Sequence, residues 1–393
     1  MPAAVRLGNA RASVRVVPDS PYSVVCVAVD RGYLDDPPAC TGLAHLFEHV
    51  WFARDPDLGT LAWGETRENA VLLHHACPPE EVAAVVDAVA RRLDDGDRRA
   101  TAPHIAAARA LIGLERRGLR EDRLRGFPRL DIARALRGDR TFDPVAVTAA
   151  GLDPPAVADA IRRFPAGRAH ALAVVGPTAS PTADDLARLL AGAVPGAVPG
   201  GDRATGPPAL LPRERRAPEE PRDAGGGDAG ACARAWVLPS GPEVAAAAWL
   251  GGSLLERRSW PAPLRWASGR VVSPRGVAPV RGGQLYAVAA GTAPAGTAAR
   301  RPNLVDDVLL PALHGPSDDL RLAREAVAAT RFDTAELAAI DALDLLAPGR
   351  AGRHDDVLDA VRRADAGTLR AFGELLASSP SAAFRARPGT ASW

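Results

Sequence analysis

The chain has 393 residues, of which 48 are basic and 47 acidic, and a formal net charge of +1. A charge this close to zero gives no long-range field that would attract nucleic acid or an anionic membrane surface, so we expect neither as a partner. The length suits two domains of roughly 150–200 residues each.

The N-terminus and the cysteines predict a soluble, cytoplasmic protein. The segment Met1 to Arg6 lacks the apolar core of a signal peptide, and no stretch reaches the roughly 18–20 apolar residues of a membrane span. The cysteines are dispersed and form no C-x-x-C pair, which is typical of buried thiols in a reducing compartment. They are Cys26, Cys40, Cys77 and Cys232.

The first predicted elements are strands. Residues 12–30 hold two β-branched runs around a Pro-Asp-Ser-Pro turn, which predicts an antiparallel pair. The apolar run 43–52 predicts a buried helix, and residues 70–77 predict a further strand. His74 and His75 lie in that strand, where alternation predicts that one points inward and the other outward. We interpret both histidines as structural.

Helices and one more strand follow in the first half. The helices are predicted at 78–94, 103–120, 154–164 and 184–190, and the strand at 169–176. Because the first two strands of the chain adjoin directly, the pattern favours an α+β fold over a doubly wound parallel sheet.

The composition changes sharply near residue 194. Residues 195–230 are dominated by Pro, Gly, Arg, Glu and Asp, and such a segment buries too little apolar surface to offset its chain entropy. We therefore predict domains at 1–194 and 231–393, joined by a linker at 195–230. The second half contains an apolar segment at 231–250 and a predicted strand at 284–290. Its predicted helices lie at 319–330, 334–346 and 354–376.

The motif that carries chemistry is His45-Leu-Phe-Glu48-His49. On a helix, His45 and His49 lie on one face about one turn apart, which allows both imidazoles to bind one zinc ion. Glu48 lies beside that face and can accept a proton from a water molecule that the metal has acidified. A surface helix with incidental histidines is the alternative, but the neighbouring residues are apolar and predict burial, which requires partners for all three side chains.

The residues around this inverted H-x-x-E-H motif resemble the insulinase/pitrilysin family of zinc metallopeptidases. The similar stretches are RGYLDDPPACTGLAHLFEHVWF (31–52), LAWGETRENAVLLHHACPPEEVAAVVDAVARRL (61–93) and FPAGRAHALAVVGPT (164–178). Together they cover most of residues 5–195. The resemblance implies an α+β fold of two related domains, each a mainly antiparallel sheet flanked by helices, with a degenerate second domain.

The same resemblance implies a third zinc ligand on a later helix, where Glu115 is the candidate and Glu121 the alternative. The family pattern E-R-x-V-V-x-x-E also has a supporting glutamate seven residues before the ligand. This sequence has Ala108 at that position, so the supporting acid is absent.

In the second half, the segment RGGQLYAV (281–288) is similar to a family stretch that supplies an arginine and a tyrosine near the substrate. The similarity implies that Arg281 and Tyr286 hold or polarise the scissile carbonyl. Short members of the family pair with a related subunit, which implies a homodimer or heterodimer here.

We therefore predict a zinc-dependent endopeptidase that cleaves peptides or unstructured precursor segments. His45, His49 and Glu115 would bind zinc, and Glu48 would activate water. The substrate would lie along a sheet edge near Ala62 and Trp63 by strand addition. The alternatives are a catalytically weak or inactive subunit that binds peptide or a partner peptidase subunit, and a zinc hydrolase of a non-peptide substrate.

Overall fold

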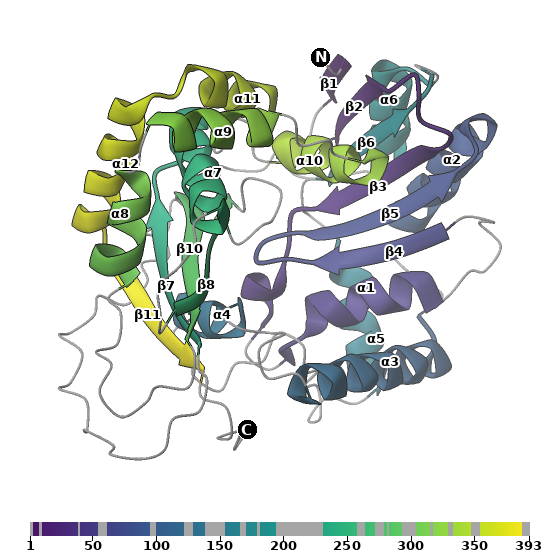
Figure 1. Ribbon diagram of the computed structural model, residues 1–393. Coiled ribbons are helices and arrows are strands. Elements are labelled where there is room, and N and C mark those ends of the chain that lie inside the picture. Colours follow the sequence, from purple (N-terminus) through teal and green to yellow (C-terminus); the bar gives the residue numbers. More distant parts are fainter. Residues whose placement is uncertain are drawn as a thin grey trace. The chain divides into compact units, whose positions relative to one another are not determined.

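The structure is a computed structural model, shown in Figure 1. It describes residues 3–7, 10–37, 40–53, 61–94, 100–121, 129–137, 154–165, 170–178, 181–193, 231–257, 264–271, 279–280, 283–292, 304–314, 317–328, 333–346 and 354–386. The predicted linker at 195–230 lies outside these residues.

The first of two structural units is built on a six-stranded sheet with the order β1-β2-β6-β3-β5-β4. Only β2 and β6 pair in parallel, and the other neighbours are antiparallel. The strands are β1 (Ala3–Leu7), β2 (Ala10–Val16), β3 (Ser23–Val29), β4 (Leu61–Thr66), β5 (Val71–Cys77) and β6 (His170–Gly176).

The predicted direct pairing of the first two β-branched runs is wrong. These runs form β2 and β3, but β6 lies between them and pairs with both. The turn sequence at 17–22 is local, whereas the choice of strand partner depends on a segment far along the chain, so local pattern alone did not predict the insertion of β6.

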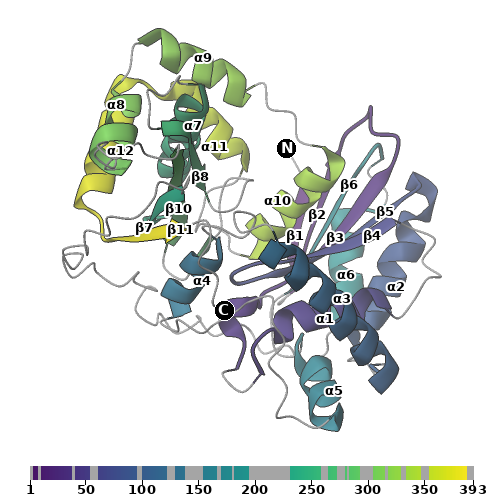
Figure 2. The same cartoon turned by 60° about the horizontal axis from the view of Figure 1, so that its bottom comes forward.

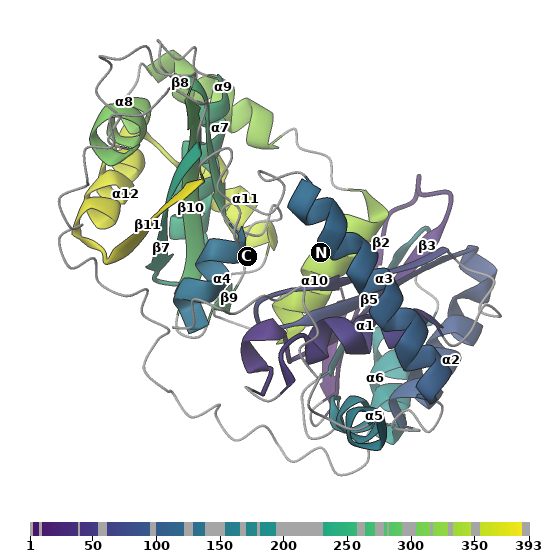
Figure 3. The same ribbon diagram turned by 90° about the horizontal axis from the view of Figure 1, so that it is seen from below.

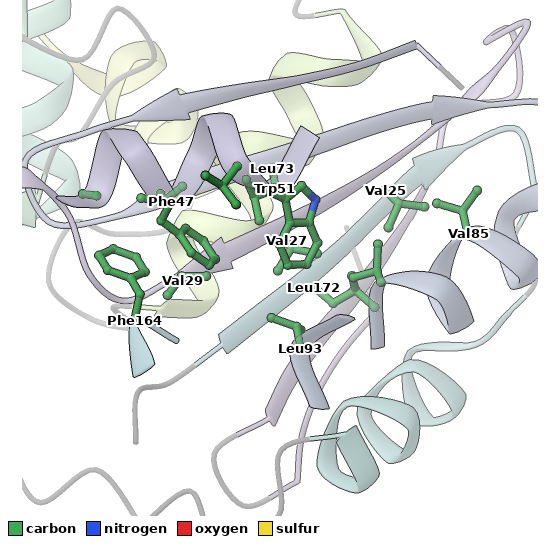
Figure 4. Close-up of a cluster of buried hydrophobic side chains, with 14 of the residues drawn as sticks. Val25, Val27, Val29, Phe47, Trp51, Leu73, Val85, Leu93, Phe164 and Leu172 are labelled. Atoms are coloured by element: carbon green, nitrogen blue, oxygen red, sulfur yellow. The ribbon is translucent and has the colours of Figure 1, made fainter. Parts of the chain in front are cut away.

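Helices cover one face of this sheet and form the main core of the unit. Valines of β3 pack there against Phe47 and Trp51, as Figure 4 shows. Phe47 also stacks on Phe164 with ring centroids 4.5 Å apart. The helices and helical turns of the unit before the linker are η1 (Tyr33–Asp35), α1 (Leu43–Ala53), η4 (Pro79–Glu81), α2 (Val82–Asp94), α3 (Ala102–Glu121), α5 (Pro154–Arg163) and α6 (Ala183–Ala193).

The opposite face is covered by α10 (Thr334–Leu346), a helix from the second half of the chain (Figure 2). Its alanines and leucines pack on Cys26, Leu72 and other side chains of the sheet. Asp341 accepts two hydrogen bonds of 2.8 Å each from Arg15 on β2. Because polar and apolar contacts both hold this helix, α10 is an integral part of the first unit.

The second unit has a five-stranded antiparallel sheet with the path β11-β7-β10-β8, and β9 pairs with β10. Its strands are β7 (Ala231–Leu238), β8 (Leu264–Val271), β9 (Pro279–Val280), β10 (Gly283–Thr292) and β11 (Ser381–Ala386). Its helices are α4 (Arg129–Arg137), α7 (Pro242–Arg257), η6 (Leu304–Leu309), α8 (Leu310–Leu313), α9 (Ser317–Ala328), α11 (His354–Arg363) and α12 (Ala366–Ser378).

Each unit contains segments from both halves of the chain, whereas the predicted domains 1–194 and 231–393 are continuous. Helix α4 comes from the first half, yet its Ile132 packs on Ala235, Ala287 and Ala382 of the second sheet. Helix α10 comes from the second half of the chain and belongs to the first unit. Two mainly antiparallel sheets with helices confirm the α+β fold. Among the described residues, no helix combines the length and apolar character that a membrane crossing requires.

Candidate metal centre

The candidate site lies on α1, whose first turn is fixed by a buried carboxylate. Asp36 accepts hydrogen bonds from the backbone N–H groups of Gly42 at 2.7 Å and Ala44 at 2.9 Å. Gly42 has φ 79°, a left-handed conformation that glycine adopts without a steric penalty. The two contacts satisfy N–H groups at the start of the helix and so set the direction in which α1 enters the core.

The predicted ligands come together where α1 runs alongside α3 (Figures 1 and 3). The Nε2 atoms of His45 and His49 lie 3.1 Å apart. Glu115 on α3 places Oε2 3.2 Å from His45 Nε2 and Oε1 3.4 Å from His49 Nε2. The structure therefore brings two imidazole nitrogens and one carboxylate to a common point.

These distances fit a zinc ion. Ligands bound at 2.0–2.1 Å in a tetrahedral arrangement lie roughly 3.3–3.4 Å from one another. The separations of 3.1–3.4 Å in this site are close to that value. Two imidazoles and one carboxylate leave the fourth position open, as catalytic zinc sites do.

Glu48 lies beside the pair of histidines, and ligand-type atoms of His45, Glu48 and His49 lie within 4.8 Å of one another. Burial raises the pKa of the Glu48 carboxyl above its ordinary value, while His45 and the hydrogen bond from Thr66 oppose that rise. A carboxylate that is buried and close to the metal position is suited to exchange protons with a reacting water molecule.

Glu115, the predicted third ligand, faces both histidines. Its carboxylate is half-exposed, and contacts with His45 and His49 hold its pKa well below its usual range, so it is ionised. Ala108, where the resembling family has the supporting glutamate, is fully buried in the core of the first unit. The side chain of Glu121 lies outside the described residues.

The predicted substrate edge is β4, which is the last strand of the first sheet. Ala62 and Trp63 lie in this strand and are partly exposed. Trp63 stacks on His74 of β5 with ring centroids 4.8 Å apart and an angle of 1° between the planes. Among the described residues, no strand pairs with the outer side of β4. The outward-facing backbone groups of an edge strand are of the kind that can pair with an extended chain.

Two residues of β4 that lie outside the sequence motif contact Glu48. Thr66 Oγ1 donates a hydrogen bond of 2.5 Å to Glu48 Oε2. A Cβ atom added to Gly64 would lie 2.2 Å from Glu48 Cγ. One sequence signal points to this contact with Glu48: Gly64 and Thr66 are two residues apart in a strand and therefore lie on the same face.

His74 and His75 point to opposite faces of the sheet as alternation predicts, but the expected outward exposure is wrong. Both side chains are fully buried, because helices cover both faces. His75 accepts a hydrogen bond of 3.3 Å from Trp51 Nε1, and burial lowers its pKa to about 4. Their structural interpretation therefore agrees with their positions.

The structure contradicts the substrate-binding role predicted for Tyr286. This tyrosine is fully buried in the core of the second unit, against Trp236 and Phe372. Its hydroxyl has no hydrogen-bond partner in the described residues, and burial raises the pKa of the phenol. A short β-strand pattern cannot distinguish a core tyrosine from one that faces a substrate. Arg281 lies outside the described residues.

Comparison with solved structures identifies the fold. The chain is similar to a peptidase M16 inactive domain from Pseudomonas fluorescens, with a TM-score of 0.67, 14% identity and coverage of 100% of this chain and 99% of that chain. It is equally similar to a protease from Helicobacter pylori, with a TM-score of 0.68, 13% identity and 99% coverage of both chains.

A third similar structure is a chain of complex III2 from Candida albicans, with a TM-score of 0.68, 10% identity and coverage of 98% of this chain and 95% of that chain. No family model and no curated protein matches the sequence. At these identities the likeness shows the fold, which is that of the M16 peptidases, and confirms the fold expected from the insulinase/pitrilysin resemblance.

Proposed function

We propose that the protein is a zinc-dependent endopeptidase that cleaves peptides or unstructured segments. The observation that supports this most is the set of separations among His45, His49 and Glu115, which match those of ligands around one tetrahedral zinc ion. The fold adds support, since one of the similar structures is described as a protease.

In this proposal the reaction depends on Glu48. A zinc ion held by His45, His49 and Glu115 would supply Lewis-acid chemistry to the scissile carbonyl and to a water molecule. Glu48 would accept a proton from the attacking water molecule and deliver it to the leaving amine. Its burial keeps competing bulk water away from the carboxylate.

The substrate would pair with the outer side of β4. Backbone groups of an extended peptide would form the hydrogen bonds of a seventh strand, with Ala62 and Trp63 beside it. Because Ala62 lies on the α1 face of the strand, with Gly64 and Thr66, the peptide would pass next to Glu48. Only a chain that can extend fits this mode, which favours short or unfolded substrates.

A related subunit is the partner we propose, as a homodimer or heterodimer. One similar structure is a chain of a multi-subunit complex. With Tyr286 inside the core, the second unit of this chain offers no tyrosine to the substrate at that position. A partner chain would supply the groups that face the zinc-bearing surface.

A non-catalytic subunit is the second candidate, and specific observations favour it. Ala108 replaces the supporting acid of the resembling family and is packed in apolar core. Tyr286 is likewise a core residue, and one similar structure is described as an inactive domain. In this case the site would bind metal or peptide without turnover.

A direct experiment separates the two candidates. The zinc content of the purified chain is measured, and a mixture of unstructured peptides is incubated with the zinc-loaded protein, alone and with any copurifying partner. We expect one zinc per chain, cleavage products in the mass spectrum, and loss of cleavage after chelation that zinc restores. Zinc binding without any product would support the non-catalytic subunit, and absence of zinc would reject the proposed function.

A further inference from the structure

Strand β4 lies directly against the motif helix α1, and it presents one face to Glu48. In the register with β5, Ala62 lies opposite His75 and Gly64 lies opposite Leu73. These residues, together with Thr66, are on the face of the sheet that α1 covers. Trp63 and Glu65 belong to the opposite face, together with His74. The contacts of β4 with Glu48 are therefore confined to alternate residues.

Gly64 gives the Glu48 side chain the space that it occupies. A Cβ atom at this position would lie 2.2 Å from Glu48 Cγ, 2.6 Å from Cδ and 2.7 Å from Oε1. Real Cβ atoms do not approach other atoms so closely, so any side chain at residue 64 would displace the Glu48 carboxylate. The absence of a side chain is thus required by the conformation of Glu48.

Thr66 fixes the orientation of the same carboxylate. Its hydroxyl donates to Oε2 at 2.5 Å, a charge-assisted hydrogen bond in a largely buried environment. A hydroxyl has a single hydrogen to donate, so this bond selects one carboxylate oxygen. The side chain is also β-branched and stiff at χ1, which limits the positions that the hydroxyl can take.

We propose that Gly64 and Thr66 are positioning residues that hold Glu48 in its reactive orientation beside the metal position. The inference rests on the proposed function, and it adds a role for two residues that bind neither metal nor leaving group. It also means that β4 has two roles: it is the edge strand with which a peptide would pair, and it holds the Glu48 carboxylate in place.

The test uses full-length, zinc-loaded protein with Thr66→Val, Thr66→Ser and Gly64→Ala. Thr66→Val keeps the shape but removes the hydrogen bond, and we expect kcat to fall at least tenfold, against the roughly 10²–10⁴-fold that a general base contributes. KM should stay within about twofold, and zinc content should remain one per chain. Thr66→Ser restores the donor and should regain most of kcat, while Gly64→Ala should lower kcat as Thr66→Val does.

A matched control lies on the same strand. Glu65→Gln alters β4 on the opposite face, where Glu65 pairs with Arg67, and it should leave kcat within about threefold of wild type. If Thr66→Val keeps the wild-type kcat, or if Thr66→Ser fails to restore activity that Thr66→Val lost, the inference is overturned.

A zinc-free measurement separates this inference from the proposed function. The urea midpoint of unfolding is determined for wild type, Thr66→Val, Glu48→Ala and the double variant in the presence of a chelator. We expect Thr66→Val to lower the midpoint at least twice as much in wild type as in Glu48→Ala. If wild type cleaves no peptide, the proposed function fails, but the double-mutant cycle still tests the positioning role. A smaller effect of Thr66→Val in the Glu48→Ala background supports that role, and equal effects in both backgrounds overturn it.

Discussion

His45 Nε2 lies 3.2 Å from Glu115 Oε2, although the two residues belong to different helices. Helix α1 supplies His45 with the motif, and α3 supplies Glu115 much later in the chain. This contact adds a carboxylate to the two imidazoles of the local sequence motif.

The first prediction concerns that ligand. Glu115→Gln removes the charge that would neutralise the metal, so we expect zinc affinity to fall by more than the roughly 10–100-fold caused by loss of an outer-shell partner. Competition with a chelating dye gives the dissociation constant. Glu80→Gln changes an exposed glutamate of η4, serves as the control and should leave zinc affinity unchanged. Equal affinity for Glu115→Gln and wild type would show that Glu115 is not a ligand.

The second prediction concerns the attachment of α10 to the first sheet. Arg15 and Asp341 form two hydrogen bonds, with side-chain exposures of 16% and 3%. Asp341→Ala removes both hydrogen bonds of a largely buried ion pair, so it should lower the free energy of unfolding by about 2–4 kcal/mol. Urea titration measures the change.

Two controls show whether the loss reflects the pair. Glu325→Gln breaks the exposed pair with Arg321 and should cost less than about 0.5 kcal/mol. Replacing both Arg15 and Asp341 by apolar residues of similar size should restore most of the stability. A double variant with the summed loss of the two single variants would rule out the coupling.

The third prediction is a pH dependence of stability due to His170. Burial lowers the pKa of this histidine to about 4, from 6.5 in the unfolded chain. The folded state then binds fewer protons between these values, so the stabilisation is complete above pH 6.5 and is lost as the pH falls toward 4. Between pH 7 and 5 the contribution is about 2 kcal/mol.

Chemical denaturation of zinc-free protein at both pH values tests this. The free energy of unfolding of wild type should fall more on acidification than that of His170→Gln, by about 2 kcal/mol. Comparing the two proteins cancels the contributions of the metal-site histidines. Parallel pH profiles would mean that His170 is protonated equally in the folded and unfolded states.

The fourth prediction follows from the burial of Tyr286. Its hydroxyl has no partner in the described residues, and leaving a buried polar group unsatisfied costs about 1–3 kcal/mol. Tyr286→Phe should therefore keep or raise the free energy of unfolding and leave kcat and KM unchanged. A large fall in kcat would instead restore the substrate-binding role that the sequence resemblance implied.

Local patterns predicted the elements well where a single helix or strand carries its own signal. The apolar run around His45 and Glu48 became α1, and the acidic start after Pro78 became η4 and α2. The i,i+4 spacing also placed the two histidines correctly, because helix geometry alone sets that distance.

The features that were not predicted depend on contacts between distant segments. No local sequence pattern indicates that β6 lies between β2 and β3. The same holds for α4 and α10, each of which packs in the unit formed mainly by the other half of the chain. For the same reason the Thr66–Glu48 hydrogen bond and the core position of Tyr286 could not be deduced from spacing. Both depend on which face of a strand meets which helix.

The most direct test of the proposed function compares wild type with Glu48→Gln, both zinc-loaded, on one unstructured peptide that wild type cleaves. Glutamine keeps the size of the side chain but cannot carry a proton in the reaction, so kcat should fall by about 10²–10⁴-fold with one zinc per chain retained. Wild-type turnover that Glu48→Gln leaves undiminished, with zinc bound in both, would contradict the role of Glu48 and with it the proposed mechanism.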